Sequence, residues 1–115
     1  MRDYRKYKVW ELGHQLTLAI YAMTKKFPKE ETYGIPSQMR RSSYSIPANI
    51  AEGCGRESDA EFRRFLVISQ GSASELEYFL ILAKDLNFLK EQDFEKFDDE
   101  VNKVKRSLNN LINKI

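Results

Sequence analysis

Few side chains in this chain could do chemistry. His14 is its only histidine and Cys54 its only cysteine. A Ser–His–Asp or Cys–His arrangement would have to use His14, which is distant from Cys54 in the sequence and shares a predicted helix side with Trp10. Cys54 lies between two glycines at a predicted helix end, and this setting favours a small buried residue over a reactive thiol. The sequence therefore predicts no catalytic residue and a non-enzymatic protein.

Metal and cofactor sites are also unsupported by the residue pattern. One histidine and one cysteine cannot supply the ligands of a structural zinc site. Residues 53–56 (Gly-Cys-Gly-Arg) are too short for a phosphate-binding loop and precede no strand. Glu75 and Glu77 stand two positions apart on a predicted helix, so their carboxylates do not face each other as an acid–base pair. We expect neither a metal nor a cofactor.

Basic side chains form the one pattern with a chemical use, which is contact with the phosphates of RNA or DNA. They gather in three places: an N-terminal arm, the start of the second predicted helix, and the region around the start of the third. The arm also carries two tyrosines suited to base stacking. The candidate nucleic-acid-binding residues are Arg5, Lys6, Lys8, Arg40, Arg41, Arg56, Arg63 and Arg64. No base-reading motif is visible, so binding should be electrostatic and largely insensitive to base sequence.

Other interpretations stay open for these arginines, and for Arg40 and Arg41 one of them is simple exposure to solvent. Arg40 and Arg41 could belong to a polar seam, in which charged and amide groups of neighbouring helices or subunits satisfy each other. Arg56 and Arg63 could pair with nearby carboxylates between residues 52 and 59. These pairs would leave little positive potential to attract a nucleic acid. The formal net charge is only +2, with +4 in residues 1–64 and −2 in residues 65–115.

Helix breakers and caps divide the chain into four predicted helices. The first ends at residue 27 before Pro28, and Pro36 fits the first turn of the second. Gly53 closes the second helix, and Ser58 with Glu61 has the spacing of a capping box that opens the third. The third runs to about residue 87, and the fourth covers residues 93–115. We predict an all-α protein, an antiparallel up-down-up-down four-helix bundle over residues 9–115, preceded by a basic arm over residues 1–8.

Two of these helices carry more apolar surface than one core needs, whereas the fourth has a single stripe. The stripe of the fourth helix is Phe94, Phe97, Val101, Val104, Leu108, Leu111 and Ile115. The candidate oligomer-interface residues, on a second side of the first and third helices, are Trp10, His14, Tyr21, Val67, Gly71, Ser74, Tyr78 and Ile81, with Thr17 on the same side. A patch of this kind usually marks a partner surface, so we expect a homo-oligomer. Alternatively, the N-terminal arm or long Lys and Arg side chains cover it.

The second predicted helix contains a proline near its middle, which costs about 3 kcal/mol in a helix interior. Pro47 leaves the carbonyl of Ser43 without its usual donor, and Ser42 and Ser43 are small enough to let a neighbouring helix approach closely. The motif residues that we single out are Ser45, Pro47, Asn49, Glu52 and Gly53. The stability of a helix bundle alone does not explain the choice of residues in this segment.

Length and composition set the remaining limits. With 115 residues the chain can build one hydrophobic core and one domain. No apolar run approaches the ~20 residues of a membrane span, and the first residues lack the apolar region of a signal peptide. A lone cysteine cannot form an internal disulfide and is typical of a reducing compartment. We expect a cytoplasmic protein with no membrane partner.

Residues from about 9 to 90 also match a known pattern. They are Trp10, Phe27, Pro28, Glu31, Tyr33, Gly34, Gln38, Arg41, the run from Ser45 to Gly53, Gly55, Arg56, Phe62, Phe65, Leu66, Gly71, Ser72, Glu75, Leu76 and Glu77. In these residues the chain resembles the four-helix-bundle proteins encoded in intervening sequences of bacterial 23S rRNA genes. The chain departs from that pattern at Ser42 and at Tyr78-Phe79, and the second departure could alter a subunit contact.

The resemblance implies an antiparallel four-helix bundle that assembles into a ring, a homopentamer. The accessory protein of diversity-generating retroelements is similar, and it works as a basic ring that binds nucleic acid and the reverse transcriptase. A ring would repeat each basic cluster around one axis. The first hypothesis is therefore a non-enzymatic oligomeric bundle that binds RNA or DNA by charge as an accessory factor. The second is a ring that docks a protein partner without direct nucleic-acid binding, and the weak net charge keeps it open.

Overall fold

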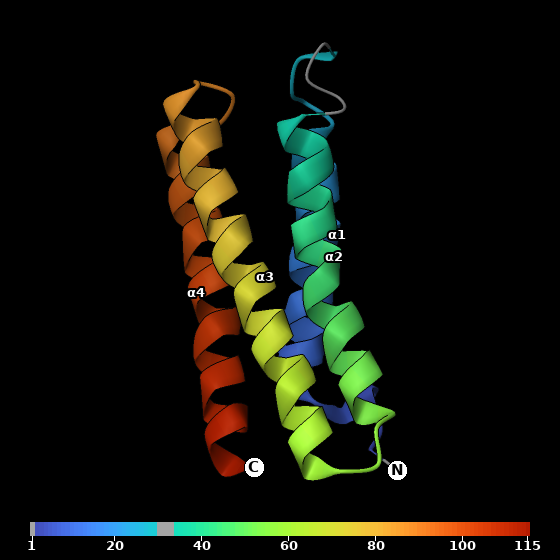
Figure 1. The fold of residues 1–115 in the computed structure, drawn as a ribbon. Helices are drawn as coiled ribbons and strands as arrows, with labels where there is room; N and C mark the ends of the chain where they lie inside the picture. The colour runs from blue at the N-terminus through green and yellow to red at the C-terminus, as the bar shows by residue number, and fades with distance from the viewer. Residues whose placement is uncertain (1, 30–33) are drawn as a thin grey trace.

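The computed structural model describes residues 2–29 and 34–115. Within these residues a short 3-10 helix, Tyr4–Lys6, precedes four α-helices: α1 Lys8–Thr24, α2 Ile35–Cys54, α3 Asp59–Asp85 and α4 Glu91–Lys114. Successive helices run antiparallel and pack on each other, and α4 also packs on α1 (Figure 1). The structure confirms the predicted all-α four-helix bundle.

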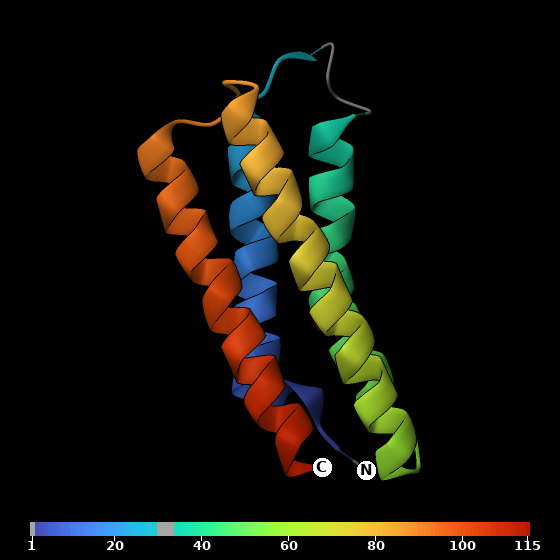
Figure 2. The ribbon, with the colours of Figure 1, turned by 60° about the vertical axis from the view of Figure 1, so that its left-hand side comes forward.

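The bundle is about 43 Å long and has two distinct ends. Both chain termini and the α2–α3 turn lie at one end, which we call the terminal end (Figures 1 and 2). The end of α1, the start of α2 and the α3–α4 turn lie at the other, which we call the loop end. Residues far apart in the sequence are therefore neighbours at each end.

The helix boundaries lie close to those expected, although α1 ends at Thr24, three residues before the predicted end at residue 27. Pro36 lies in the first turn of α2, and the Ser58 side chain accepts a hydrogen bond from the amide of Glu61 at the start of α3. α3 ends two residues before the predicted position because Asn87 adopts a left-handed conformation, with φ of 63°. The amides of Asn87 and Phe88 then donate to the carbonyls of Lys84 and Ala83, the bond pattern of a Schellman cap.

The core takes apolar side chains from all four helices, including Ile20, Ile46, Leu76 and Leu108. On α4 the predicted stripe is wrong at its C-terminal end, since Ile112 is buried whereas Ile115 is 36% exposed. The reason is that the core side of α4 continues from Leu108 by a step of four. A step of three reaches Leu111, which is only partly buried.

Helices α1 and α2 approach each other closely at Pro47. A Cβ atom on Gly13 would lie 3.1 Å from Cγ2 of Ile46 and 3.4 Å from Cδ of Pro47, so the glycine relieves a tight contact with Ile46 beside the proline. The Thr17 hydroxyl lies 3.0 Å from the carbonyl oxygen of Ser43 and 2.8 Å from that of Gly13. Thr17 is buried here, so its predicted place on the outer stripe of the first helix is wrong. Its hydroxyl supplies α2 with a donor that Pro47 cannot provide.

Candidate nucleic-acid interface

The eight predicted nucleic-acid-binding residues separate into two groups in the structure. Six of them occupy the terminal end. They lie on the arm, at the start of α1, in the α2–α3 turn and near the start of α3: Arg5, Lys6, Lys8, Arg56, Arg63 and Arg64. Arg40 and Arg41 lie about 22 Å further along the bundle, at 1.5 Å per residue of α2. The structure therefore brings six of the eight together and leaves two apart.

Arg41 lies in a polar seam between α2 and α3. Its Nη2 atom is 2.7 Å from Oε1 of Glu75, and its Nε atom is 3.1 Å from Oε1 of Gln38. Both side chains of the ion pair are about two-fifths exposed, at 42% and 41%. The charge of Arg41 is thus largely matched inside the chain, although its guanidinium still reaches solvent.

Arg40 points to the other neighbour of α2. Its Nε atom donates to Oγ1 of Thr24 at 2.8 Å, and its guanidinium carbon lies 4.9 Å from the ring centre of Tyr21. No carboxylate within the described residues pairs with Arg40. Its positive charge is therefore retained, but its side chain is held against α1.

Three further arginines, Arg56, Arg63 and Arg64, lie in the α2–α3 turn and the second turn of α3, and two of them contact the same aromatic ring. The guanidinium carbons of Arg56 and Arg64 lie 4.8 and 5.5 Å from the ring centre of Phe65. Arg56 also pairs with Glu52, at 3.4 Å between Nη2 and Oε2. Arg63 is exposed and forms no ion pair with a described residue. Of the three, Arg63 and Arg64 keep their charge without a paired carboxylate.

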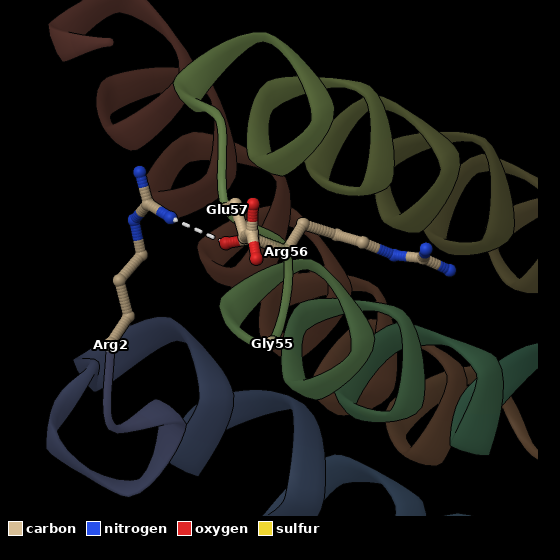
Figure 3. A pocket seen from close by; sticks show the side chains of 4 residues that line it. All are labelled: Arg2, Gly55, Arg56 and Glu57. Atoms are coloured by element: carbon tan, nitrogen blue, oxygen red, sulfur yellow. Dashed lines mark hydrogen bonds between the residues drawn. The ribbon is translucent and has the colours of Figure 1, made fainter.

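The N-terminal arm is fixed to the α2–α3 turn by Arg2. Its guanidinium carbon lies 4.2 Å from the ring centre of Phe62, it pairs with Asp59, and it donates to the carbonyl of Arg56 at 3.3 Å. Figure 3 shows Arg2 facing the turn, where a pocket of about 620 Å³ is lined by Arg2, Gly55, Arg56 and Glu57. Arg2 thus acts as a structural anchor, and it positions the basic residues that follow it.

The arm aromatics are also used inside the chain. Tyr4 lies 5.1 Å from Trp10 and Tyr7 lies 5.8 Å from Phe62, between ring centres. The arm therefore partly covers the outer stripe of α1, as one of the alternatives expected. Asp3 accepts from the amide of Arg5, and this bond lowers the pKa of its carboxyl group. The arm therefore carries basic side chains, while the rings of Tyr4 and Tyr7 already have partners inside the chain.

The C-terminal part of α4 adds basic residues that the sequence analysis missed. Residues 91–100 hold six Asp and Glu and one Lys, whereas residues 101–115 hold four Lys and Arg and no Asp or Glu. Lys105 pairs with Glu77 and Lys103 with Glu100, at 3.0 and 3.8 Å. Arg106 and Lys114 are exposed and form no ion pair with a described residue. An average over residues 65–115 hid this reversal of sign, which two shorter windows would have shown.

Together these segments make the terminal end basic. Residues 2–11, 48–66 and 101–115 hold eleven Lys and Arg against six Asp and Glu, a net charge of +5. The rest of the chain holds eight against eleven, a net charge of −3. The small overall charge of +2 therefore conceals a molecule with opposite charge on its two parts.

The predicted oligomer-interface residues divide into an exposed group on α3 and a partly covered group on α1. On α3 the side chains of Val67, Tyr78 and Ile81 are 48%, 56% and 40% exposed. Ser74 is exposed, and a Cβ atom on Gly71 would meet nothing within 4 Å.

On α1, Tyr21 is exposed, while the rings of Trp10 and His14 are half-buried and stack at 5.1 Å. Leu18 on α1 and Tyr44 on α2 are also exposed and are not among the predicted interface residues. Tyr44 lies between two serines, so no apolar stripe marks it, whereas Leu18 lies in an apolar run but on neither predicted stripe of the first helix.

The motif residues of α2 have structural partners. The Ser45 hydroxyl donates to the carbonyl of Arg41, and the Asn49 amide donates to that of Ser45, each at 2.8 Å. A Cβ atom on Gly53 would lie 2.9 Å from Cβ of Phe65, so this glycine permits the close approach of α2 and α3. The motif shapes helix contacts inside the chain.

Other kinds of site find no support in the described residues. They contain no group of three or more His, Cys, Asp and Glu side chains that could hold a metal ion. Burial raises the pKa of the Cys54 thiol, which disfavours the reactive thiolate. Within the same residues, no helix has the length and apolarity needed to cross a membrane.

Comparison with known proteins agrees with this architecture. One solved structure, a protein of unknown function from the S23 ribosomal protein family of Bacteroides thetaiotaomicron VPI-5482, superposes with a TM-score of 0.86 at 25% sequence identity. The match covers 91% of this chain and 95% of that one. None of the curated proteins compared with the chain matches it. The family model described as 23S rRNA-intervening sequence protein matches residues 5–110, and the chain therefore belongs to the family of 23S rRNA-intervening sequence proteins.

Proposed function

We propose that the protein is a non-enzymatic, oligomeric four-helix bundle that binds RNA or DNA through its terminal end, largely without regard to base sequence, as an accessory factor. The observation that carries this proposal is the net charge of +5 gathered at that end, against −3 in the rest of the chain. Lys and Arg that neutralise phosphates release counterions, which supplies affinity without reading bases.

The exposed unpaired cations are the main contacts in this proposal. Arg63 and Arg64 lie in the second turn of α3, and Arg106 and Lys114 lie in the C-terminal turns of α4. Lys6 on the arm and Lys8 at the start of α1, which form no ion pair with a described residue, add charge to the same end. Arg5 instead pairs with Asp3, at 3.4 Å between Nε and Oδ1. Arg56 contributes less because it pairs with Glu52. We retain Arg40 and Arg41 as secondary contacts, since their side chains are held by other residues of the chain.

Self-association completes the proposal. A monomer offers only a few cations to one nucleic acid, whereas a ring repeats the terminal end around its axis. The exposed apolar stripe of α3 is our candidate for the subunit contact, and a homopentamer is the assembly that the family resemblance implies. We place this assembly in the cytoplasm, because the single buried cysteine fits a reducing compartment.

The direct test is binding to nucleic acid at several salt concentrations. Fluorescence anisotropy would follow a labelled RNA hairpin and a labelled DNA duplex between about 50 and 200 mM salt, where phosphate-driven binding weakens steeply. The proposal expects both ligands to bind, and both affinities to fall as salt rises. Absence of binding at the lowest salt would overturn it.

A second candidate function is docking of a protein partner without direct nucleic-acid contact. It is favoured by the exposure of Tyr44 and Tyr78, at 47% and 56%, since tyrosines often anchor protein interfaces. A pull-down that recovers one stoichiometric protein, survives nuclease treatment and is lost in Tyr44→Glu would support this alternative.

A further inference from the structure

A pocket of about 450 Å³ lies between α1 and α4 at the loop end, away from the basic terminal end. Its walls are apolar, with Phe27 and Phe97 among the buried lining residues. The ring of Phe88 packs against Phe27 at 5.6 Å between centres and extends the same wall. Ala19 and Ala22 line the α1 side, so small side chains leave the space open.

The polar residues around this pocket are mainly lysines. Lys26, Lys90 and Lys96 line it together with one carboxylate, that of Asp93. None of the four forms an ion pair with a described residue. The pocket lining therefore has a net charge of +2, although it lies in the part of the chain whose net charge is −3.

An apolar hollow bordered by unpaired cations fits one chemical class of ligand. We propose that this pocket binds a small organic anion with an apolar body, such as a medium-chain carboxylate. The apolar part would lie against the phenylalanine rings and the two alanines, and the carboxylate would lie among the ammonium groups. The volume is in the range of small-molecule sites, roughly 300 to 1,000 Å³. A protein partner would need a surface of about 800 Å², and this compact pocket does not itself provide one.

Calorimetric titration with octanoate tests the charge and the apolar part separately, with octanol as the neutral probe of similar length. We expect one octanoate per protomer and an affinity about tenfold above that of octanol. Lys26→Glu with Lys96→Glu should remove about tenfold of the octanoate affinity and change octanol binding little. Arg63→Glu with Arg64→Glu, at the terminal end, is the control and should change neither.

Filling the pocket tests its location. Ala22 is exposed on α1, so Ala22→Trp should keep the fold, as checked by circular dichroism, while weakening both probes about tenfold. Ala19→Leu is a milder second variant on the same helix and should weaken both probes less. Failure of octanoate to bind, equal affinity for octanol, or unchanged binding by both filled variants would overturn the proposal.

Discussion

Arg41 on α2 and Glu75 on α3 form an ion pair, with 2.7 Å between Nη2 and Oε1. The pair links two helices that also pack closely at Gly53, near the C-terminal end of α2. It shows why a basic residue in a motif is weak evidence for nucleic-acid binding, because the charge can be matched within the chain. The surface that we propose for phosphate contact is therefore the one where cations lack such partners.

The ion pair should contribute little to stability because both side chains are about two-fifths exposed. In a double-mutant cycle of Arg41→Ala and Glu75→Ala, we expect a coupling of about 0.5–1 kcal/mol in the free energy of unfolding, decreasing as salt rises. Urea denaturation of the four proteins measures it. A coupling of zero at low salt would show that the two side chains do not interact in solution.

Thr17 should contribute more to the free energy of unfolding than an exposed polar residue does. Thr17→Val keeps the shape but removes the donor to the Ser43 carbonyl, which Pro47 has already deprived of an amide partner. The free energy of unfolding should fall by about 1–3 kcal/mol, the cost of a buried polar group without a partner. Thr17→Ser is the control, since it keeps the hydroxyl. Equal stability of the valine and serine variants would contradict this role.

Thr17 also shows where sequence reasoning reached its limit. The positions of proline, glycine and serine predict the boundaries of the four helices to within a few residues, because helix breakers and caps act locally. The helical spacing of Thr17 with Trp10, His14 and Tyr21 places it on the outer side, and only the packing of α1 on Pro47 shows that its hydroxyl has a buried partner. For a similar reason, the sequence predicts only some of the basic residues at the terminal end. Arg106 and Lys114 lie at the same end as the arm only because the antiparallel order of the helices brings both chain termini there.

Two glycines offer a matched test of helix packing. Gly53→Ala would place Cβ 2.9 Å from Cβ of Phe65, so α2 and α3 must separate, at a cost of about 1–3 kcal/mol in the free energy of unfolding. Gly71→Ala meets nothing within 4 Å, and in a helix it should be neutral or stabilise by up to about 1 kcal/mol. Thermal denaturation compares them. The packing account fails if Gly53→Ala is as stable as the unchanged protein.

The stripe of α3 predicts how assembly can be broken without unfolding. Tyr78→Glu puts a charge at the centre of the proposed subunit contact, whereas the side chain is already exposed in the protomer. The variant should therefore remain helical and sediment as a monomer, at concentrations where the unchanged protein is oligomeric. Asn110→Glu, on an exposed position of α4, is the control and should stay assembled. If Tyr78→Glu assembles normally, the subunit contact lies elsewhere.

The most direct test of the central claim compares two variants that change the net charge equally. One carries Glu at Arg63, Arg64, Arg106 and Lys114, at the terminal end. The other carries Glu at Lys25, Lys26, Lys90 and Lys96, nearer the loop end. Anisotropy with a labelled DNA duplex, from about 50 to 200 mM salt, gives the affinity and its salt dependence. We predict that the first variant loses most of its affinity and has a shallower salt dependence, while the second retains both. Equal losses in the two variants, or binding that survives the first, would contradict a nucleic-acid surface at the terminal end.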